Sequence, residues 1–407
     1  MIDLTVTSIF FLFCLIIGPL LMAQNLHLRR WSFLGVCLCL FLLSINNFES
    51  LAAITVFVVF PYCYLYIVRK WNSPIWPAIL IQLFLLIYIN KYTWILSFFG
   101  IPIPFFISLV GVSYILFRQL DVLFQVKAQL VQTISLIDYL NYLLSFWTIL
   151  AGPIQRYREF IKEFYGDKIP VSDDEALLCF HRATNGMLKI VIIGPIFSYI
   201  SDTSFCHLIS HDPTVFLSGS PLWLFGILYC FPLYIYFNFS GYCDVVIGMA
   251  RWAGFSIPEN FNRPYLSRDM IEMWNRWHIT LSQWIRDYLY QPLFKFLLSG
   301  PLHNHLSFSQ YLSIFITFFL VGIWHGTTIN IFIFGLLQGF GMAISMIYRD
   351  ICKKHMGKER YKSFYNNKWV ANSERFITLN FWGFTFLVFQ YDIFKISTSL
   401  LAFIGVK

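Results

Sequence analysis

The sequence predicts an all-α integral membrane protein with about 10–12 transmembrane or re-entrant helices. Of its 407 residues, 58% are hydrophobic and only 12% are charged, whereas a soluble domain carries about a quarter charged residues. The mean hydropathy is +0.64. Aromatic residues make up 20% of the chain, which is typical of lipid-facing surfaces and interfacial belts. We therefore expect a multi-pass protein that is embedded in a bilayer.

Apolar runs recur along the chain at lengths near the ~20 residues that cross a ~30 Å hydrocarbon core. The basic pairs Arg29-Arg30 and Arg69-Lys70 alternate with residues 46–50, which lack basic residues, so we expect the N-terminus outside and both pairs inside. The first run, Ile9 to Ala23, has no basic segment before it and no small-residue cleavage site after it, so we interpret it as a retained span. The candidate spans lie near residues 5–24, 32–47, 51–68, 75–97, 101–120, 136–153, 184–200, 215–238, 241–256, 308–329, 330–348 and 376–402.

We expect one polytopic membrane domain, residues 1–407, which comprises N-terminal helices (1–104), a central core (105–348), a basic cytoplasmic loop (349–375) and a C-terminal span (376–402). The loop contains eight Lys and Arg residues and three acidic residues. This excess favours a positive-inside loop over a nucleic-acid-binding arm. Membrane lipids are therefore expected partners, and nucleic acid is not.

The nine cysteines predict neither disulfides nor a metal site. Most of them lie in apolar runs, where a thiol behaves as a small apolar side chain. The sequence contains no CxxC pair and no zinc-ligand spacing. We expect no metal and no bound cofactor.

The stretch Gly152-Pro153-Ile154 ends a hydrophobic run and begins a charged amphipathic stretch that continues to about Arg182. A helix on the membrane surface, with its charges in water, explains residues 162–175. Arg156 and Arg158 follow the Gly-Pro pair closely and can reach an anionic group of a substrate. Arg156 is therefore a candidate binding residue.

Residues 268–290 are expected to form one interfacial or re-entrant helix, because they are too polar to span lipid. Ser267 is the expected N-cap, and Glu272 can pair with Arg276 at i, i+4. One wide aromatic stripe is expected along this helix, made by Trp274, Trp277, Leu281, Trp284 and Tyr288.

His278 lies at the edge of this stripe. A histidine in that position is more often a structural residue that hydrogen-bonds a neighbouring carbonyl than a functional one. The functional alternative is that His278 orients a substrate or lines a tunnel.

His325 follows an uncharged run from Tyr311 to Trp324 and lies between Gly322 and Gly326. The glycines let another backbone or a ligand approach closely. A neutral imidazole at membrane depth can accept a proton from an alcohol, as a general base must. The structural alternative is a hydrogen bond between helices.

These residues favour acyl transfer, in which His325 draws the proton from an acceptor hydroxyl that attacks a thioester or ester. Motifs of other chemistries are missing from the sequence, including GxSxG, the P-loop, GxGxxG before a helix and HExxH. Asn262, Asn275 and Arg276 are candidates to stabilise the oxyanion. Trp274, Trp277 and Trp324 are further candidates for substrate binding.

At these residues the chain resembles the bacterial branch of the membrane-bound O-acyltransferase superfamily. The ordered match covers residues of about 105 to 345, and the first hundred residues match only as generic membrane helices. Two subgroups compete: residues 248–251 and 258–261 look like the alginate O-acetylation type, whereas residues 266–278 look like the D-alanyl transferase of teichoic-acid modification. The motifs are Gly152-Pro153-Ile154 with Arg156, Phe239-Ser240-Gly241-Tyr242 with Asp244, Asn260-Phe261-Asn262 with Pro264-Tyr265, Trp274 to His278, Arg286-Asp287-Tyr288, and Trp324-His325-Gly326.

The resemblance implies that His325 matches the catalytic histidine of the family and His278 its supporting histidine. It also implies an all-α funnel in the bacterial cytoplasmic (inner) membrane, with the donor bound on the cytoplasmic side and the acceptor outside. An extracytoplasmic acyltransferase partner is a further implication. Asn238 departs from the pattern, because the family often carries Asp there, and this can alter activity or acceptor choice.

The first hypothesis is an O-acyltransferase that moves an acyl group, with acetyl expected first, from a cytoplasmic thioester such as acetyl-CoA to a hydroxyl of a cell-envelope polysaccharide or similar polymer. The second is the same chemistry with D-alanine, delivered to teichoic acid by a phosphopantetheinyl carrier protein. The third is a transporter whose polar midplane residues line a permeation path. The chain shows no internal repeat, which argues against the third.

Overall fold

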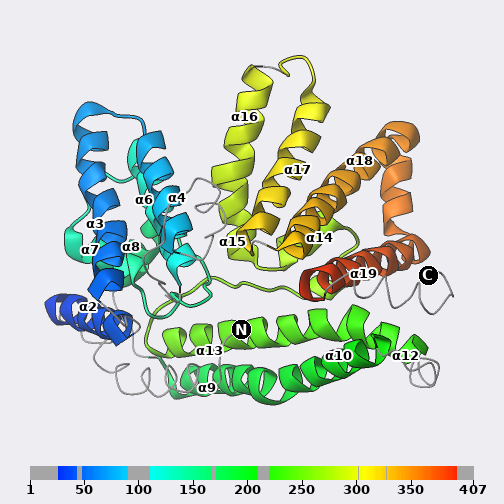
Figure 1. Ribbon diagram of the computed structural model, residues 1–407, viewed down its shortest axis with the longest axis horizontal. Coiled ribbons are helices and arrows are strands. Elements are labelled where there is room, and N and C mark those ends of the chain that lie inside the picture. Colours follow the sequence, from blue (N-terminus) through cyan, green and yellow to red (C-terminus); the bar gives the residue numbers. More distant parts are fainter. Residues whose placement is uncertain are drawn as a thin grey trace. The chain divides into compact units, whose positions relative to one another are not determined.

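The computed structural model of the chain describes residues 26–43, 48–89, 111–166, 171–209, 220–300, 302–326 and 328–391. Within these ranges the protein is helical and contains no β-strand, apart from one isolated bridge between Phe261 and Trp277 (Figure 1). The all-α prediction is therefore confirmed. The predicted span at 5–24 lies outside the described residues, as do residues 101–110 of the span predicted at 101–120 and the end of the C-terminal span after residue 391. Residues 44–47, 90–97 and 215–219, at the ends of three other predicted spans, also lie outside them.

Four of the described helical segments are long and apolar enough to cross a membrane. Two shorter apolar helices, Trp76–Ile87 and Leu306–Gly322, accompany them. These segments agree with a multi-pass membrane protein, while the total of 10–12 stays a prediction. The four are Leu51–Trp71, Asp173–His207, Leu222–Trp252 and Ile329–Asn366.

The chain forms two compact units. The first consists of Met1–Gly186 with Tyr242–Pro258, and the second of Met187–Gly241 with Glu259–Lys407. The expectation of one polytopic domain stays a prediction, because two compact units can belong to one membrane domain.

The first unit is held by buried polar contacts between its helices, which are α2 (Leu26–Leu43), α3 (Phe48–Trp71), α4 (Trp76–Ile89), α6 (Val112–Lys127), α7 (Leu136–Leu143), α8 (Tyr157–Tyr165) and most of α9 (Asp173–Leu188). Pro61 lies inside α3 and has no N–H to donate, so the carbonyl of Phe57 loses its helical partner. The buried amides of Gln82 in α4 and Gln119 in α6 donate to that carbonyl, at 3.2 and 2.7 Å. The helix that contains Pro61 is thereby tied to both neighbours.

The second unit contains every candidate site residue except Arg156. Its first part comprises the π-helix η1 (Lys189–Ile193), α10 (Gly194–Leu208), α12 (Ser220–Phe225), the π-helix η2 (Gly226–Cys230) and α13 (Phe231–Trp252), whose end belongs to the first unit. The 3₁₀ helix η3 (Pro264–Leu266), α14 (Met270–Arg276), α15 (Ile279–Ile285), the π-helix η4 (Arg286–Tyr290) and α16 (Gln291–Ser299) follow. The unit ends with α17 (Leu306–Trp324), α18 (Ile329–Asn366) and α19 (Lys368–Gln390).

Helices α17 and α18 lie side by side at very short range (Figure 1). A Cβ atom on Gly322 would lie 2.0 Å from the Cα of Gly335, and one on Gly339 would lie 2.7 Å from the carbonyl oxygen of Phe315. Only glycine fits at such a backbone contact. The predicted role of Gly322 in a close backbone approach is confirmed.

The basic stretch 349–375 is mostly helical, and its prediction as a cytoplasmic connection between two spans stays a prediction. Helix α18 continues through a kink at Gly357 (φ 71°, ψ 167°) to Asn366, and α19 begins at Lys368. Arg268, just before α14, pairs with Glu374 at 2.5 Å and lies over the ring of Tyr365 at 3.6 Å. Lys and Arg are good helix formers, and this clamp adds tertiary support.

Candidate active site

His278 lies at a break between two short helices. Residues 268–290 do not form the single helix that their period predicts, because α14 ends at Arg276 and α15 begins at Ile279. The backbone bonds at the break go to a distant segment: Asn262 N–H donates to Arg276 O, and Ile279 N–H donates to Asn260 O, both at 2.9 Å. His278 adopts the left-handed conformation between them (φ 46°, ψ 51°), which is rare for a residue with a side chain.

The side chain of Asn260 holds the same break. Its Oδ1 accepts from the backbone N–H of Thr280 at 3.2 Å and from the Thr280 hydroxyl at 2.8 Å. The Nδ1 of His278 lies 3.2 Å from the same oxygen. This contact agrees with the structural alternative, in which His278 hydrogen-bonds a neighbouring carbonyl, and here the carbonyl belongs to a side-chain amide.

The imidazole of His278 is enclosed. It is 5% exposed, and the ring of Phe239 from α13 meets it edge-on, with the ring centres 4.8 Å apart. Both flanking helices have seven residues, too few to span a bilayer. Burial, which disfavours the charged ring, and the nearby His325 lower the pKa of His278 to about 3. The ring is therefore neutral at physiological pH.

The start of α14 is capped by Asp269, so the predicted cap at Ser267 is wrong. Asp269 accepts from Glu272 N–H at 2.9 Å and also pairs with Arg349 of α18 at 2.5 Å. The predicted pair between Glu272 and Arg276 is confirmed, at 2.7 Å. Because its guanidinium is paired with Glu272, Arg276 is oriented by its own helix, and its role at an oxyanion stays a prediction.

Two of the tryptophans predicted to bind substrate, Trp274 and Trp277, are buried. Trp274 is buried, and its Nε1–H donates to Oε1 of the buried Gln338 in α18 at 3.0 Å. Trp277 is buried in an aromatic cluster with Phe261 and Trp382, whose ring centres lie 5.2 and 5.3 Å away. Both rings also pack against Trp382, whose ring centre lies 6.0 Å from that of Trp274. The break at His278 separates these two side chains from Leu281, Trp284 and Tyr288, so the expected stripe is not continuous.

His325 occupies the turn directly after α17. Its backbone N–H donates to Gly322 O at 3.0 Å, and its side chain is exposed. The imidazole is bordered by the rings of Trp324 at 4.7 Å, Phe389 at 5.8 Å and Phe334 at 6.1 Å between centres. An accessible imidazole in an aromatic frame can exchange a proton with a bound hydroxyl.

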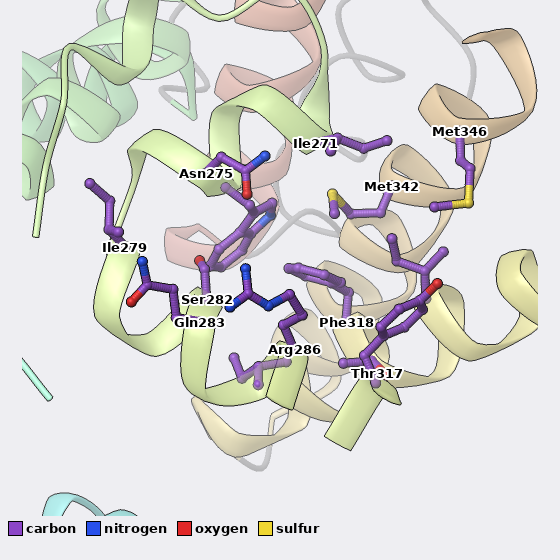
Figure 2. A pocket seen from close by; sticks show the side chains of 14 residues that line it. Ile271, Asn275, Ile279, Ser282, Gln283, Arg286, Thr317, Phe318, Met342 and Met346 are labelled. Carbon is purple, nitrogen blue, oxygen red and sulfur yellow. The ribbon is translucent and has the colours of Figure 1, made fainter. Parts of the chain in front are cut away.

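A cavity of about 210 Å³ lies between the segment from α14 to η4 on one side and the helices α17 and α18 on the other (Figure 2). Asn275, Gln283 and Arg286 come from the first side. Phe318 and Met342 come from the second (Figure 2). Trp274 and Asn275, two of the predicted binding residues, line the cavity, whereas neither histidine does.

The cavity wall contains an unsatisfied hydroxyl. The Oγ1 of Thr317 in α17 is buried, with 1% of the residue exposed, and has no hydrogen-bond partner among the residues that the structure describes. A buried polar group without a partner costs free energy unless a ligand or water satisfies it. The cavity therefore combines an apolar wall that carries the Thr317 hydroxyl with a polar side formed by Asn275, Gln283 and Arg286.

The remaining candidates are placed as follows. Asn262 is exposed, and its backbone forms the bridge to Arg276. Arg156 belongs to the first unit, where its guanidinium lies 3.3 Å from the buried Asp121. Among the residues that the structure describes, no cluster of three metal-ligating side chains occurs.

Sequence reasoning missed Asn260, Gln338 and Thr317 as site residues. Asn260 was visible only as part of the Asn260-Phe261-Asn262 motif. Gln338 and Thr317 were polar residues inside apolar runs, a signal that can mark a buried hydrogen bond or a ligand contact.

Comparison with known proteins places this geometry in context. The sequence model of the MBOAT (membrane-bound O-acyltransferase) family matches residues 76–373, which include every candidate site residue. The teichoic acid D-alanyltransferase of Bacillus subtilis (strain 168) is 28% identical over 404 residues, which cover 93% of this chain and 96% of that protein. The probable alginate O-acetylase AlgI of Azotobacter vinelandii is 33% identical over 260 residues, which cover 63% of this chain and 48% of that protein.

Proposed function

Because the chain belongs to the membrane-bound O-acyltransferase family, we propose that it moves an acyl group from a thioester donor to a hydroxyl of a cell-envelope polymer, with His325 as general base. The observation that carries this role is the accessible imidazole of His325, framed by Trp324 and Phe389 on a turn that close glycine packing holds in place. Family membership argues against the transporter hypothesis.

In the proposed transfer a C–O bond replaces the C–S bond of the thioester, and one proton moves from the hydroxyl to the leaving thiolate by way of His325. A nitrogen of the neutral His325 takes the proton of the acceptor hydroxyl, and the hydroxyl oxygen forms a bond to the thioester carbonyl carbon. The negative charge that develops on the carbonyl oxygen requires hydrogen-bond donors, for which Asn262, Asn275 and Arg276 are the candidates. The C–S bond then breaks, and the leaving thiolate receives the proton from His325.

The cavity of Figure 2 is the proposed binding site for the phosphopantetheine arm of the thioester donor. A phosphopantetheine arm is a narrow chain with amides along it and a phosphate at its outer end. Arg286, with 58% of its side chain exposed, can meet the phosphate, and the hydroxyl of Thr317 can donate to a carbonyl of the arm. Asn275 and Gln283 can bind the amides.

Two acyl groups are candidates. Acetyl is supported by the higher identity, 33%, to the alginate O-acetylase of A. vinelandii. D-alanyl is supported by a match that covers 96% of the D-alanyltransferase of B. subtilis but only 48% of that alginate O-acetylase. The acceptor is an envelope polysaccharide in the first case and teichoic acid in the second.

The chain is a multi-pass membrane protein, and we place it in the bacterial cytoplasmic membrane. Its donor is then cytoplasmic acetyl-CoA or an acyl carrier protein, and an extracytoplasmic acyltransferase partner completes delivery to the polymer. No cofactor is required, since the thioester supplies the activated acyl group.

The test is acyl transfer by purified protein in liposomes, with labelled acetyl-CoA and D-alanyl carrier protein offered in parallel to wild type and His325→Ala. If wild type removes the label from only one donor, and His325→Ala leaves the label on that donor, the result supports both the reaction and that acyl group. A folded His325→Ala protein with full activity would refute the role of His325. A failure of both donors, with partner proteins supplied, would refute the proposed reaction.

A further inference from the structure

We propose that Asn260 is a positioning residue that holds the ring of His278 in the tautomer with its proton on Nδ1. Nε2 is then the nitrogen that can accept a hydrogen bond or a proton during transfer. The functional part of this proposal rests on the proposed acyltransferase function, whereas the tautomer itself does not.

The orientation of the Asn260 amide follows from one neighbour. The backbone N–H of Thr280 can only donate, and it points at the Asn260 side chain at 3.2 Å, so the atom there must be the oxygen Oδ1. A flipped amide would place an NH₂ group against an N–H. The Thr280 hydroxyl adds a second donor to the same oxygen at 2.8 Å.

The position of the imidazole proton follows from that oxygen. Nδ1 of His278 lies 3.2 Å from Oδ1 of Asn260, which has no proton to give. The contact is a hydrogen bond only if Nδ1 carries the proton, and in a neutral imidazole the other nitrogen, Nε2, then keeps the lone pair.

The backbone around His278 is fixed, which limits the hydrogen-bond partners that its ring can reach. The two bonds of the bridge join residues 260–262 to residues 276–279, and His278 is fixed between them in the left-handed conformation. Phe239 from α13 packs edge-on against the ring, and His325, on the α17–α18 connection, is the titratable group that contributes to the lowered pKa of His278. The ring is therefore neutral, enclosed and oriented before any substrate binds.

The direct test is the ¹⁵N NMR spectrum of protein with labelled histidine, in which His278 is assigned by comparison with His278→Gln. We expect resonances of a protonated Nδ1 and an unprotonated Nε2 in wild type. In Asn260→Leu, which removes the acceptor, we expect the Nε2-protonated form to appear. Thr280→Val is the matched control: it removes one other bond to Oδ1, and the wild-type tautomer should persist.

The kinetic test uses Asn260→Asp, which keeps an acceptor of the same shape and adds a charge. A carboxylate stabilises the protonated ring, so the acid limb of the pH–rate profile should move upward by about one pH unit or more. Asn260→Leu should lower kcat at least about tenfold. The pH–rate profile of Thr280→Val should match that of wild type. If the role of Asn260 were purely structural, the profile of Asn260→Asp should match that of wild type as well.

Each outcome decides one point. Protonated Nε2 in wild type, or an unchanged tautomer in Asn260→Leu, would overturn the proposal. An Asn260→Asp profile that coincides with wild type would overturn the catalytic relevance of the tautomer. If Asn260→Leu does not fold, wild type and Asn260→Asp still decide. Absence of acyl transfer in wild type would refute the proposed function alone, because the NMR readout needs no turnover.

Discussion

Replacing Gly322 by alanine should separate α17 from α18 and displace His325. A Cβ atom at this position would lie 2.0 Å from the Cα and 2.7 Å from the backbone nitrogen of Gly335. Carbon atoms in contact lie roughly 3.5–4.0 Å apart, so the two backbones must move apart by about 1.5 Å. Neither neighbour is the end of a flexible side chain that can turn away.

The sizes of the expected losses in stability and in kcat follow from the packing of the two helices and from the position of His325. Overpacking of this kind costs about 1–3 kcal/mol of folding free energy. The carbonyl of Gly322 accepts the backbone N–H of His325 at 3.0 Å, so a shift of the helix end moves the imidazole with it. A displacement of about 1 Å at a reacting group can cost about 100-fold in rate. We expect kcat of Gly322→Ala to fall by about that factor.

Gly35→Ala is the matched control, because no heavy atom lies within 4 Å of a Cβ at that position in α2. Alanine is the better helix former by about 1 kcal/mol, so this variant should be as stable as wild type or more stable. Thermal unfolding in detergent and acyl transfer in liposomes are measured for all three proteins. A Gly322→Ala protein with the unfolding temperature and turnover of wild type would refute the reasoning.

Three further predictions concern the cavity and the segment around His278. Thr317→Val should raise the KM for the thioester donor about 2- to 10-fold at unchanged stability, since the hydroxyl has no partner within the described part of the chain; unchanged KM would exclude a donor contact. Trp274→Phe should cost about 1–3 kcal/mol in denaturant unfolding, because Oε1 of the buried Gln338 loses its donor, and an unaltered midpoint would contradict this. Because the pKa of His278 is lowered to about 3, the unfolded chain binds more protons below its ordinary value of about 6.5. Stability should therefore fall as pH drops from about 6.5 to 3, by at most roughly 1.4 kcal/mol per unit, and a slope unchanged in His278→Gln would assign it elsewhere.

The helical nature of the chain and its membrane class could be read from composition and period, because burial in lipid selects both. His325 was also visible, since a single ionisable residue after an uncharged run is expensive unless it has a role. The pair of Glu272 and Arg276 follows from helical spacing alone. These features depend on local sequence.

The break at His278 could not be predicted from the period. Trp274, Trp277 and Leu281 recur at helical steps, yet backbone groups at the break bond to residues 260–262, which lie more than a helical turn away in sequence. Such a bridge replaces the bonds that a continuous helix would make. The cavity was hidden for the same reason, because its two sides come from segments that only folding brings together.

The two histidines differ in a way that supports the proposed roles. A left-handed conformation at a residue with a side chain costs about 1–3 kcal/mol and persists only where its surroundings enforce it. At His278 the surroundings are the backbone bridge, Asn260 and Phe239, which keep the ring buried, neutral and fixed. His325 lies exposed on a turn, with ring contacts on its borders. Proton exchange with an incoming hydroxyl needs access, and orientation needs confinement. Accordingly, His325 is the residue suited to be the base, and His278 the residue suited to accept a hydrogen bond from a defined direction.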